Sequence, residues 1–412
     1  MAVGFEFAIV WKIFKDHKIE DSNVNSRMYK LQKAAVLYDA PSGWQMTADG
    51  DEIEFIVDQI EADQRGEGSV RSRLRALIYF IDTITNGRLA PQKQYLRNAD
   101  LSKTLVKSNT KFVINTADTF QLTANPQASA GIRLGRIRKL FRILSDPNSN
   151  AAKQFIGEPD EVRKFISRQY GYICINHTQI RDSGWKALRP SPNLRGLATL
   201  IAFYIQQGKG KGGVGAVKYL FWVMCRTSFA ALFKLIEPEE REYYQADPER
   251  WVSFICNDIM QKVPETGRVN PGRPLIERTI TEQDPTSVFK KVRVNIPITI
   301  GDWLVTMIEG ADLLSAAAHP IKGKSATKQN QKLYTDSRGY GHRLRGVAGL
   351  GDKMDNVTYR GRVEKAPVFE FRYRQRFIPC GEWPAYGIEI YRFIDRLNTG
   401  NRQAALDLGC TM

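Results

Sequence analysis

The sequence predicts a mainly α-helical protein of two domains with minor β elements. Apolar residues recur every three or four positions along three stretches, which is the spacing of one helix face. Strict alternation of apolar and polar residues, which predicts a strand, is clearest at 292–300. The chain has 412 residues, and single hydrophobic cores stop growing beyond about 250–300 residues. We therefore expect two domains.

Three stretches show the periodicity of a helix with one apolar face. In 69–86 the apolar positions are spaced by three and four, and Asn86-Gly87 supplies a stop. The stretch 132–144 carries five cations and no acid, which suits a helix lying on RNA, on an acidic membrane or in water. In 197–207 the apolar stripe includes Tyr204, and Gly208 ends the pattern.

The other predicted elements follow from local composition. Runs of proline, glycine or acidic residues predict loops, and continuous apolar runs predict buried elements. In the first half of the chain, these predictions are an arm and entry region at 1–65, a small hairpin or extended excursion at 111–123 and a helix at 160–170. In the second half, they are a buried helix at 217–236, a loop at 237–250, a helix at 251–263, a loop at 264–290, a strand at 292–300, a helix capped by Asp302 and running to about residue 319, and a final helix at 386–397.

The chain is strongly basic, with a net charge of +16 and an isoelectric point near 9.5. Such an excess usually indicates binding to nucleic acid or to an acidic membrane surface, although some basic proteins are simply soluble. Hydrophobic residues make up 42% of the chain, which argues against wholesale disorder. We therefore expect a folded protein with a polyanionic partner.

Composition also argues against several kinds of site. The five cysteines are odd in number and have no C-x-x-C spacing, so we expect neither a disulfide framework nor a thiolate zinc site. None of the four histidines pairs with another at ligand spacing. No apolar run is long enough to cross a bilayer. We predict no metal, no cofactor and a protein kept inside a cell.

Two glycine-rich segments look like phosphate-binding loops but lack the necessary residues. The segment Lys211-Gly212-Gly213-Val214-Gly215 is similar to the phosphate loop of partition-type ATPases, which continues with Lys and then Ser or Thr. This chain continues with Ala216-Val217 instead. The segment 346–351 has glycines but no strand–turn–helix context. No grouping of Ser, His and Asp stands out either, so we predict that the protein is not an enzyme.

Lysine and arginine dominate two regions of the chain. Between 181 and 235 there are nine Lys or Arg and one acid, and between 320 and 376 there are fourteen against five acids. Tyrosines are interleaved with the cations, a combination typical of single-stranded nucleic acid binding because phosphates meet cations and bases stack on rings. One surface lysine alone is more often merely solvated. The residues predicted to bind RNA are Lys186, Arg189 (the cation beside Pro190), Arg195, Tyr204, Lys209, Lys211, Lys218, Arg338, Arg343, Arg345, Arg360 and Arg362.

Several short motifs occur in a fixed order. Tyr170-Gly171-Tyr172 precedes Gln179-Ile180 and Lys186-Ala187, and Tyr204-Ile205 precedes Val217-Lys218-Tyr219. In order and spacing these motifs resemble those of nucleoproteins of nonsegmented negative-strand RNA viruses, most closely the paramyxovirus branch. Further similar segments are Leu74–Phe80, Asn98-Ala99-Asp100 and Phe377–Pro384. Lys218 and Trp383 are farther apart than the family pattern predicts, which indicates a divergent member.

The resemblance implies two largely helical domains with an RNA groove between them. Lys186 and Arg195 would contact phosphates from the amino-terminal domain, Tyr204 would lie at the junction, and arginines within 338–362 would close the groove. The implied partners are single-stranded RNA, further copies in a helical or ring polymer, and a viral phosphoprotein or polymerase. The implied location is the virion and the host cytoplasm or nucleus. The resulting boundaries are an arm at 1–30, an amino-terminal domain at 31–200, a carboxy-terminal domain at 201–395 and an arm at 396–412.

The leading hypothesis is therefore a viral nucleoprotein that encapsidates genomic RNA by contacts to its backbone and serves as the polymerase template. One alternative is a viral matrix protein that binds acidic membrane through the cationic helix at 132–144. The other is a basic DNA-binding replication protein, which should contain a recognition helix. No such helix is recognisable in the sequence.

Overall fold

A computed structural model of the chain describes thirteen segments. They are residues 1–15, 35–49, 52–61, 66–85, 95–97, 112–115, 122–146, 190–207, 223–260, 269–283, 291–310, 354–372 and 377–400. These residues divide into two compact units, each with its own core. Unit 1 contains the described residues up to Ala130 and those from Phe371 to Arg396. Unit 2 contains the described residues from Gly131 to Glu370 and from Leu397 onward.

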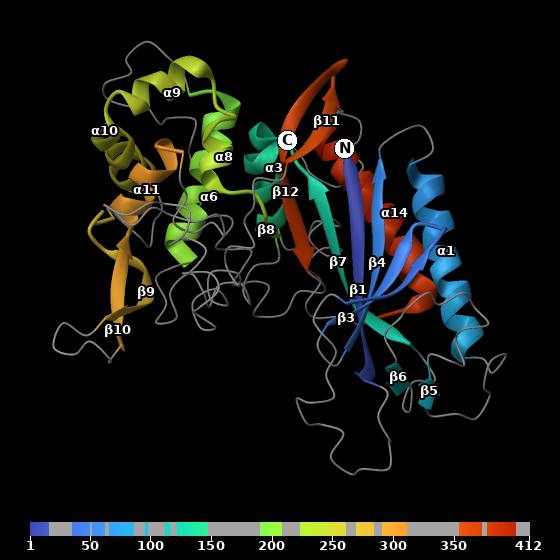
Figure 1. The fold of residues 1–412 in the computed structure, drawn as a ribbon. Helices are drawn as coiled ribbons and strands as arrows, with labels where there is room; N and C mark the ends of the chain where they lie inside the picture. The colour runs from blue at the N-terminus through green and yellow to red at the C-terminus, as the bar shows by residue number, and fades with distance from the viewer. Residues whose placement is uncertain are drawn as a thin grey trace. The chain divides into compact units, whose positions relative to one another are not determined.

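Unit 1 is built on an antiparallel sheet in the order β7-β1-β4-β3-β2 (Figure 1). Two short strands, β6 and β5, extend it beside β1, and β13 pairs with β7. The strands are β1 (Ala2–Lys15), β2 (Ala35–Ala40), β3 (Trp44–Asp49), β4 (Glu52–Glu61), β5 (Tyr95–Arg97), β6 (Phe112–Asn115), β7 (Thr123–Gly131) and β13 (Ile378–Pro379).

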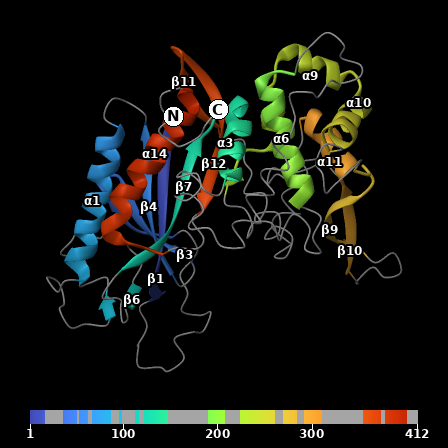
Figure 2. The ribbon, with the colours of Figure 1, turned by 180° about the vertical axis from the view of Figure 1, so that it is seen from behind.

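Two helices, α1 (Gly66–Thr85) and α14 (Trp383–Thr399), cover one face of this sheet, and Figure 2 shows them in front of the strands. Alternate residues of β1 from Val3 to Ile13 are buried, so the strand presents one continuous apolar face. The indole of Trp383 stacks on the ring of Phe7 with centroids 4.3 Å apart. The core of unit 1 therefore lies between the sheet and the two helices.

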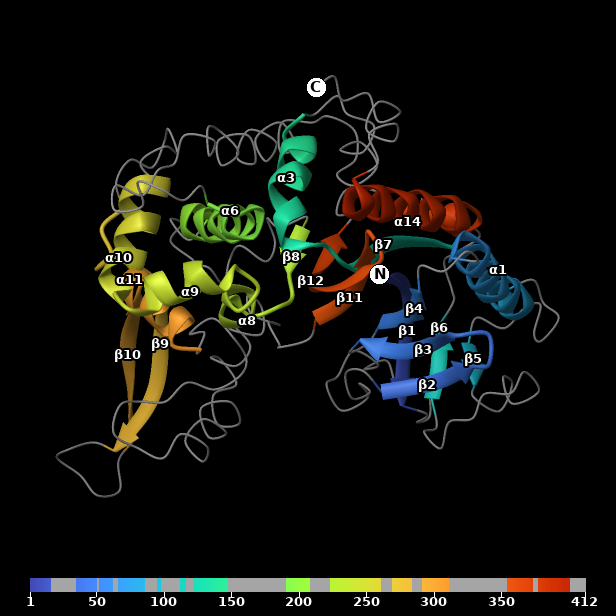
Figure 3. The same cartoon turned by 90° about the horizontal axis from the view of Figure 1, so that it is seen from above.

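Unit 2 contains most of the helices, with α6 lying between α3 and the α10–α11 pair (Figure 3). Its aromatic core includes Phe229, whose ring meets Tyr204 and Trp303 edge to face at 4.8 and 5.0 Å. The helices are η3 (Leu134–Arg136), α3 (Ile137–Ser145), α6 (Pro192–Gln207), α8 (Phe229–Phe233), α9 (Pro238–Gln245), α10 (Pro248–Ser253), the π-helix η5 (Phe254–Ile259) and α11 (Ile300–Ile308).

The strands of unit 2 form two hairpins and one short added strand. The first hairpin pairs β9 (Pro274–Gln283) with β10 (Lys291–Thr299). The second pairs β11 (Met354–Tyr359) with β12 (Arg362–Arg372), and β8 (Val223–Cys225) pairs with β12. Among the helices that the structure describes, none is long and apolar enough to span a membrane.

The predicted mainly α fold is wrong. Residues 1–65, predicted as an arm and entry region, contain the four strands β1 to β4 that form most of the unit 1 sheet. The start of the chain forms a strand because apolar residues alternate along it, which places every second side chain in the core. These buried side chains are Val3, Phe5, Phe7, Ile9, Trp11 and Ile13. A strand buried on one face needs pairing partners, and β4 and β7 supply them on both sides.

Three further local predictions are wrong in unit 2. The buried helix predicted at 217–236 is interrupted, because Arg226-Thr227-Ser228 makes other contacts. The N–H of Arg226 donates to the carbonyl of Val368, and the N–H of Val368 donates to the Thr227 hydroxyl. The Ser228 hydroxyl caps α8 by accepting from the N–H of Ala231. The loop predicted at 237–250 forms α9 and α10, and the loop predicted at 264–290 includes β9.

Elements with strong periodicity are confirmed. The predicted helices at 69–86, 132–144, 197–207 and 386–397 correspond to α1, η3 with α3, α6 and α14. The strand at 292–300 is β10, and α11 follows it. The cap of α11 is Thr299, not Asp302. The hydroxyl of Thr299 accepts from the N–H of Asp302, whose carboxylate accepts from the N–H of Thr299.

Candidate nucleic-acid interface

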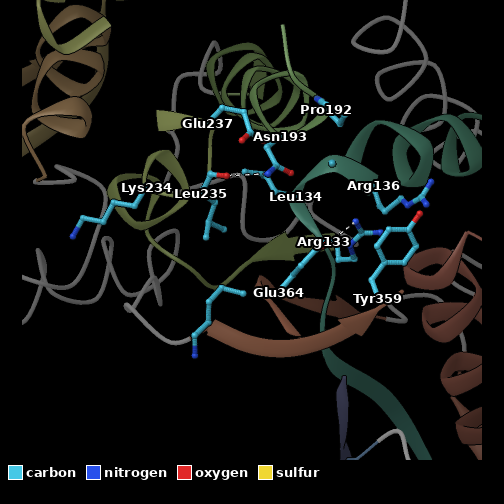
Figure 4. A pocket seen from close by; sticks show the side chains of 12 residues that line it. Arg133, Leu134, Arg136, Pro192, Asn193, Lys234, Leu235, Glu237, Tyr359 and Glu364 are labelled. Carbon is cyan, nitrogen blue, oxygen red and sulfur yellow. Dashed lines mark hydrogen bonds and ion pairs between the residues drawn. The ribbon is translucent and has the colours of Figure 1, made fainter. Parts of the chain in front are cut away.

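A pocket of about 660 Å³ opens in unit 2, with walls from four parts of the chain (Figure 4). These parts are the start of η3, the start of α6, the segment between α8 and α9, and the β11–β12 hairpin. Its volume is in the range of sites that hold small molecules. The lining residues are Arg133, Leu134, Gly135, Arg136, Pro192, Asn193, Lys234, Leu235, Glu237, Tyr359, Glu364 and Lys365. Four of them are cations and two are acids, so the lining has a positive excess that suits an anionic ligand.

Arg133 is held firmly at one end of the pocket. Its guanidinium donates to both carboxylate oxygens of Glu364, with Nε–Oε2 at 2.6 Å and Nη2–Oε1 at 3.1 Å. Its Nη1 donates to the carbonyl of Asn398, and its backbone N–H donates to Asn398 Oδ1. The guanidinium carbon lies 3.5 Å from the centroid of the Tyr359 ring. The charge of Arg133 is therefore balanced by Glu364, and its orientation is fixed.

Asn398 completes this cluster from the last turn of α14. The residue is buried, and its side-chain amide donates to the carbonyl of Gly131 at 2.8 Å. Together with the two bonds to Arg133, this fixes the chain where β7 leads into η3. An amide suits this position because it donates to one backbone group and accepts from another.

The tip of the β11–β12 hairpin places Tyr359 at the pocket. Arg360 and Gly361 form a two-residue turn with positive φ of 50° and 75°, the pattern of a type I′ hairpin in which glycine favours the second position. The guanidinium carbons of Arg360 and Arg136 lie 5.1 and 5.7 Å from the centroid of the Tyr359 ring. With Arg133, three arginines surround one tyrosine.

The remaining cations of the pocket form no ion pair with a carboxylate of the described residues. These cations are Arg136, Lys234 and Lys365. Both lysines are exposed, and Arg136 is half-buried. Figure 4 shows Lys234 on the side of the pocket opposite Arg136 and Tyr359. Positive charge is thus present at both ends.

The wall that bears Lys234 is tied to the start of α6. The buried carboxylate of Glu240 accepts from the N–H and hydroxyl of Ser191 at 2.6 and 2.7 Å. Burial raises the pKa of Glu240, and the hydrogen bonds from Ser191 oppose that rise. The amide of Asn193 donates to the carbonyl of Leu235 at 2.9 Å. These bonds hold the residues next to Lys234 in place.

Four of the residues predicted to bind RNA are described. Arg360 and Arg362 are exposed at the hairpin tip next to Tyr359. Arg195 is half-buried on α6, two residues beyond Asn193, and its Nε has no hydrogen-bond partner among the described residues. Tyr204 is 1% exposed, and its ring packs on Phe229 in the core. Lys186, Arg189, Lys209, Lys211, Lys218, Arg338, Arg343 and Arg345 lie outside the described residues.

The pocket cations are not among the residues that the sequence predicts to bind RNA. Arg133 and Arg136 belong to the cationic stretch 132–144, which suits RNA, an acidic membrane or water, and Lys234 and Lys365 lack a distinguishing local signal. The one available signal is the turn at Arg360-Gly361, because a glycine between two extended segments is typical of a hairpin. That hairpin brings Tyr359 and Lys365 to the same wall.

Acidic and basic side chains nearly balance across the described residues, so the basic excess of the chain lies in sequence outside them.

The described residues contain no group of three or more His, Cys, Asp or Glu side chains suited to a metal ion. No family model, curated protein or solved structure matches the chain. The function of the pocket must therefore be inferred from its own chemistry.

Proposed function

We propose that this protein binds single-stranded RNA through the phosphate backbone and that the pocket of unit 2 is part of the contact surface. The observation that carries the proposal is the convergence of Arg136, Lys234 and Lys365, which are far apart in sequence, on one pocket. Cations that lack an ion-pair partner among the described residues are the groups that meet phosphates. Such contacts do not depend on base sequence.

The finer proposal is that copies of the protein coat a viral RNA genome as a nucleoprotein. The order of the Tyr170-Gly171-Tyr172, Lys186-Ala187 and Val217-Lys218-Tyr219 motifs supports it, as does the charge of +16. Copies would bind side by side, and the coated RNA would be the template of a viral polymerase in the virion and the host cell. The sheet of unit 1 differs from the helical domain that the resemblance implies, so the proposal does not rest on fold.

One observation weakens the membrane-binding alternative. A helix that lies on a membrane must insert its apolar face between the lipids. In α3 the apolar residues Ile137, Leu140, Phe141 and Leu144 are at most 1% exposed, because they pack inside unit 2. The cations of this region that line the pocket are Arg133 and Arg136. The helix therefore lacks a free apolar face.

Purification at low salt, followed by the ratio of absorbance at 260 and 280 nm and by negative-stain microscopy, tests this proposal. We expect nucleic acid to copurify, to resist mild ribonuclease treatment and to dissociate at high salt, because release of counterions drives backbone binding. The stripped protein should rebind oligouridylate and oligoadenylate with equal affinity. Protein free of nucleic acid at every salt concentration, with no rebinding, would contradict the proposal. Preferential binding to one duplex DNA sequence would favour a replication protein.

A further inference from the structure

We infer that an RNA strand crosses unit 2 along this pocket, with phosphates on Arg136, Lys234 and Lys365, while Arg133 is a positioning residue that does not contact the strand. The inference rests on the proposed function and deepens it. Three of the four cations that line the pocket thus contact phosphates, and the fourth, Arg133, has a positioning role. The hydrogen-bond and ion-pair partners of each cation determine which role it has.

The guanidinium of Arg133 is already bound by protein groups at the pocket. Its Nε, Nη1 and Nη2 all donate to Glu364 or Asn398, and the guanidinium lies against Tyr359. Its side chain is only 15% exposed. A phosphate at the remaining N–H groups of Arg133 would lie close to the Glu364 carboxylate, which already pairs with the guanidinium. Like charges at such a distance repel, so this contact is unfavourable.

Arg136, Lys234 and Lys365 are placed differently. The guanidinium of Arg136 packs against Gly400, where a Cβ atom would overlap its Nη2. It therefore has a defined position but no carboxylate partner among the described residues. Lys234 lines the opposite side of the pocket, and in Figure 4 its exposed side chain extends away from Arg136 and Tyr359. A single strand carries one phosphate per nucleotide, so an extended strand would meet these cations one after another.

The hairpin tip extends this path. Arg360 lies over the Tyr359 ring, and Arg362 follows across the turn. Both arginines are exposed. They offer further phosphate contacts at the end of the pocket where Arg136 lies. The strand would thus run from the hairpin tip past Arg136 towards Lys234.

The salt dependence of oligouridylate binding, followed by fluorescence anisotropy, tests the division of roles. Each of the substitutions Arg136→Gln, Lys234→Gln and Lys365→Gln should make the slope of log K against log salt less negative by about 0.7, because one counterion fewer is released. The double variant Arg133→Gln/Glu364→Gln removes one charge of each sign. It should keep the slope of the unaltered protein even if affinity falls a few-fold through loss of positioning.

Three results would overturn the inference, and thermal unfolding of each variant confirms that it is folded. If the double variant loses as much slope as the single variants, Arg133 contacts the strand. If the unaltered protein binds oligouridylate but none of the single variants changes the slope, RNA lies elsewhere and only the proposed function stands. If the unaltered protein does not bind at low salt, both the inference and the proposed function fail.

Discussion

Reversal of three pocket cations is expected to lower the affinity for single-stranded RNA by about 100-fold at physiological salt. The variant is Arg136→Glu/Lys234→Glu/Lys365→Glu. Loss of three phosphate contacts alone accounts for most of this decrease in affinity, and the introduced carboxylates also repel the phosphates. Fluorescence anisotropy with oligouridylate measures the effect. The fold should persist, because both lysines are exposed and none of the three forms a salt bridge within the described residues.

A matched control separates local contact from net charge. The double variant Arg71→Glu/Arg75→Glu reverses two exposed cations on α1 in unit 1. It has the same net charge as Lys234→Glu/Lys365→Glu, and we expect it to change affinity only slightly, because the proposed phosphate contacts lie in the pocket of unit 2. Equal losses in the two double variants would show that RNA responds to overall charge and not to the pocket.

The second large effect is expected on stability, from Gly196→Ala. Helix α6 approaches η3 so closely at Gly196 that a Cβ atom there would overlap the backbone carbonyl oxygen of Leu134. Leu134 is buried, so η3 would have to shift away from α6. Overpacking of this kind costs about 1–3 kcal/mol, and a clash with backbone belongs at the upper end. Urea-induced unfolding of the full chain measures the change. Because η3 includes Arg136, RNA affinity should fall as well.

Gly68→Ala supplies the control for this substitution. Gly68 lies in α1, and a Cβ atom there would meet no other atom within 4 Å. Replacement of a helical glycine by alanine should stabilise unit 1 by about 0.5–1 kcal/mol, because alanine loses less conformational entropy on folding. If Gly196→Ala were as stable as Gly68→Ala, the close contact between α6 and η3 would be contradicted.

The elements that could be predicted are those whose evidence is local. Helices α1 and α6 show an apolar stripe at three- and four-residue spacing, and β10 alternates strictly. The same kind of local evidence existed for β1, where Val3, Phe5 and Phe7 alternate with smaller or polar residues. The interpretation of this segment as an arm was wrong, because alternation of apolar and polar residues is stronger evidence than the position of the segment near the start of the chain. The pairing of β1 with β7 joins residues more than a hundred positions apart, which no local pattern reveals.

The candidate site was harder to predict for a related reason. The four pocket cations become neighbours only through contacts between distant segments, such as Ser191 with Glu240 and Arg133 with Glu364. Tyr204, in contrast, is a predicted RNA contact that is buried. An aromatic ring near cations suits base stacking, but Tyr204 falls on the apolar stripe of α6 and therefore packs in the core. Tyr359, at a hairpin tip among arginines, is the ring that reaches the pocket.

Ultraviolet cross-linking of the full chain to thiouridine-substituted oligouridylate, followed by mass spectrometry of the peptides, tests the central claim most directly. RNA that follows the pocket should yield adducts in the β11–β12 hairpin, between Met354 and Arg372, and near Lys234. These adducts should disappear when the salt concentration is raised. Adducts confined to unit 1 peptides such as Gly66–Thr85, or no adducts under conditions where the protein retains RNA, would contradict the claim.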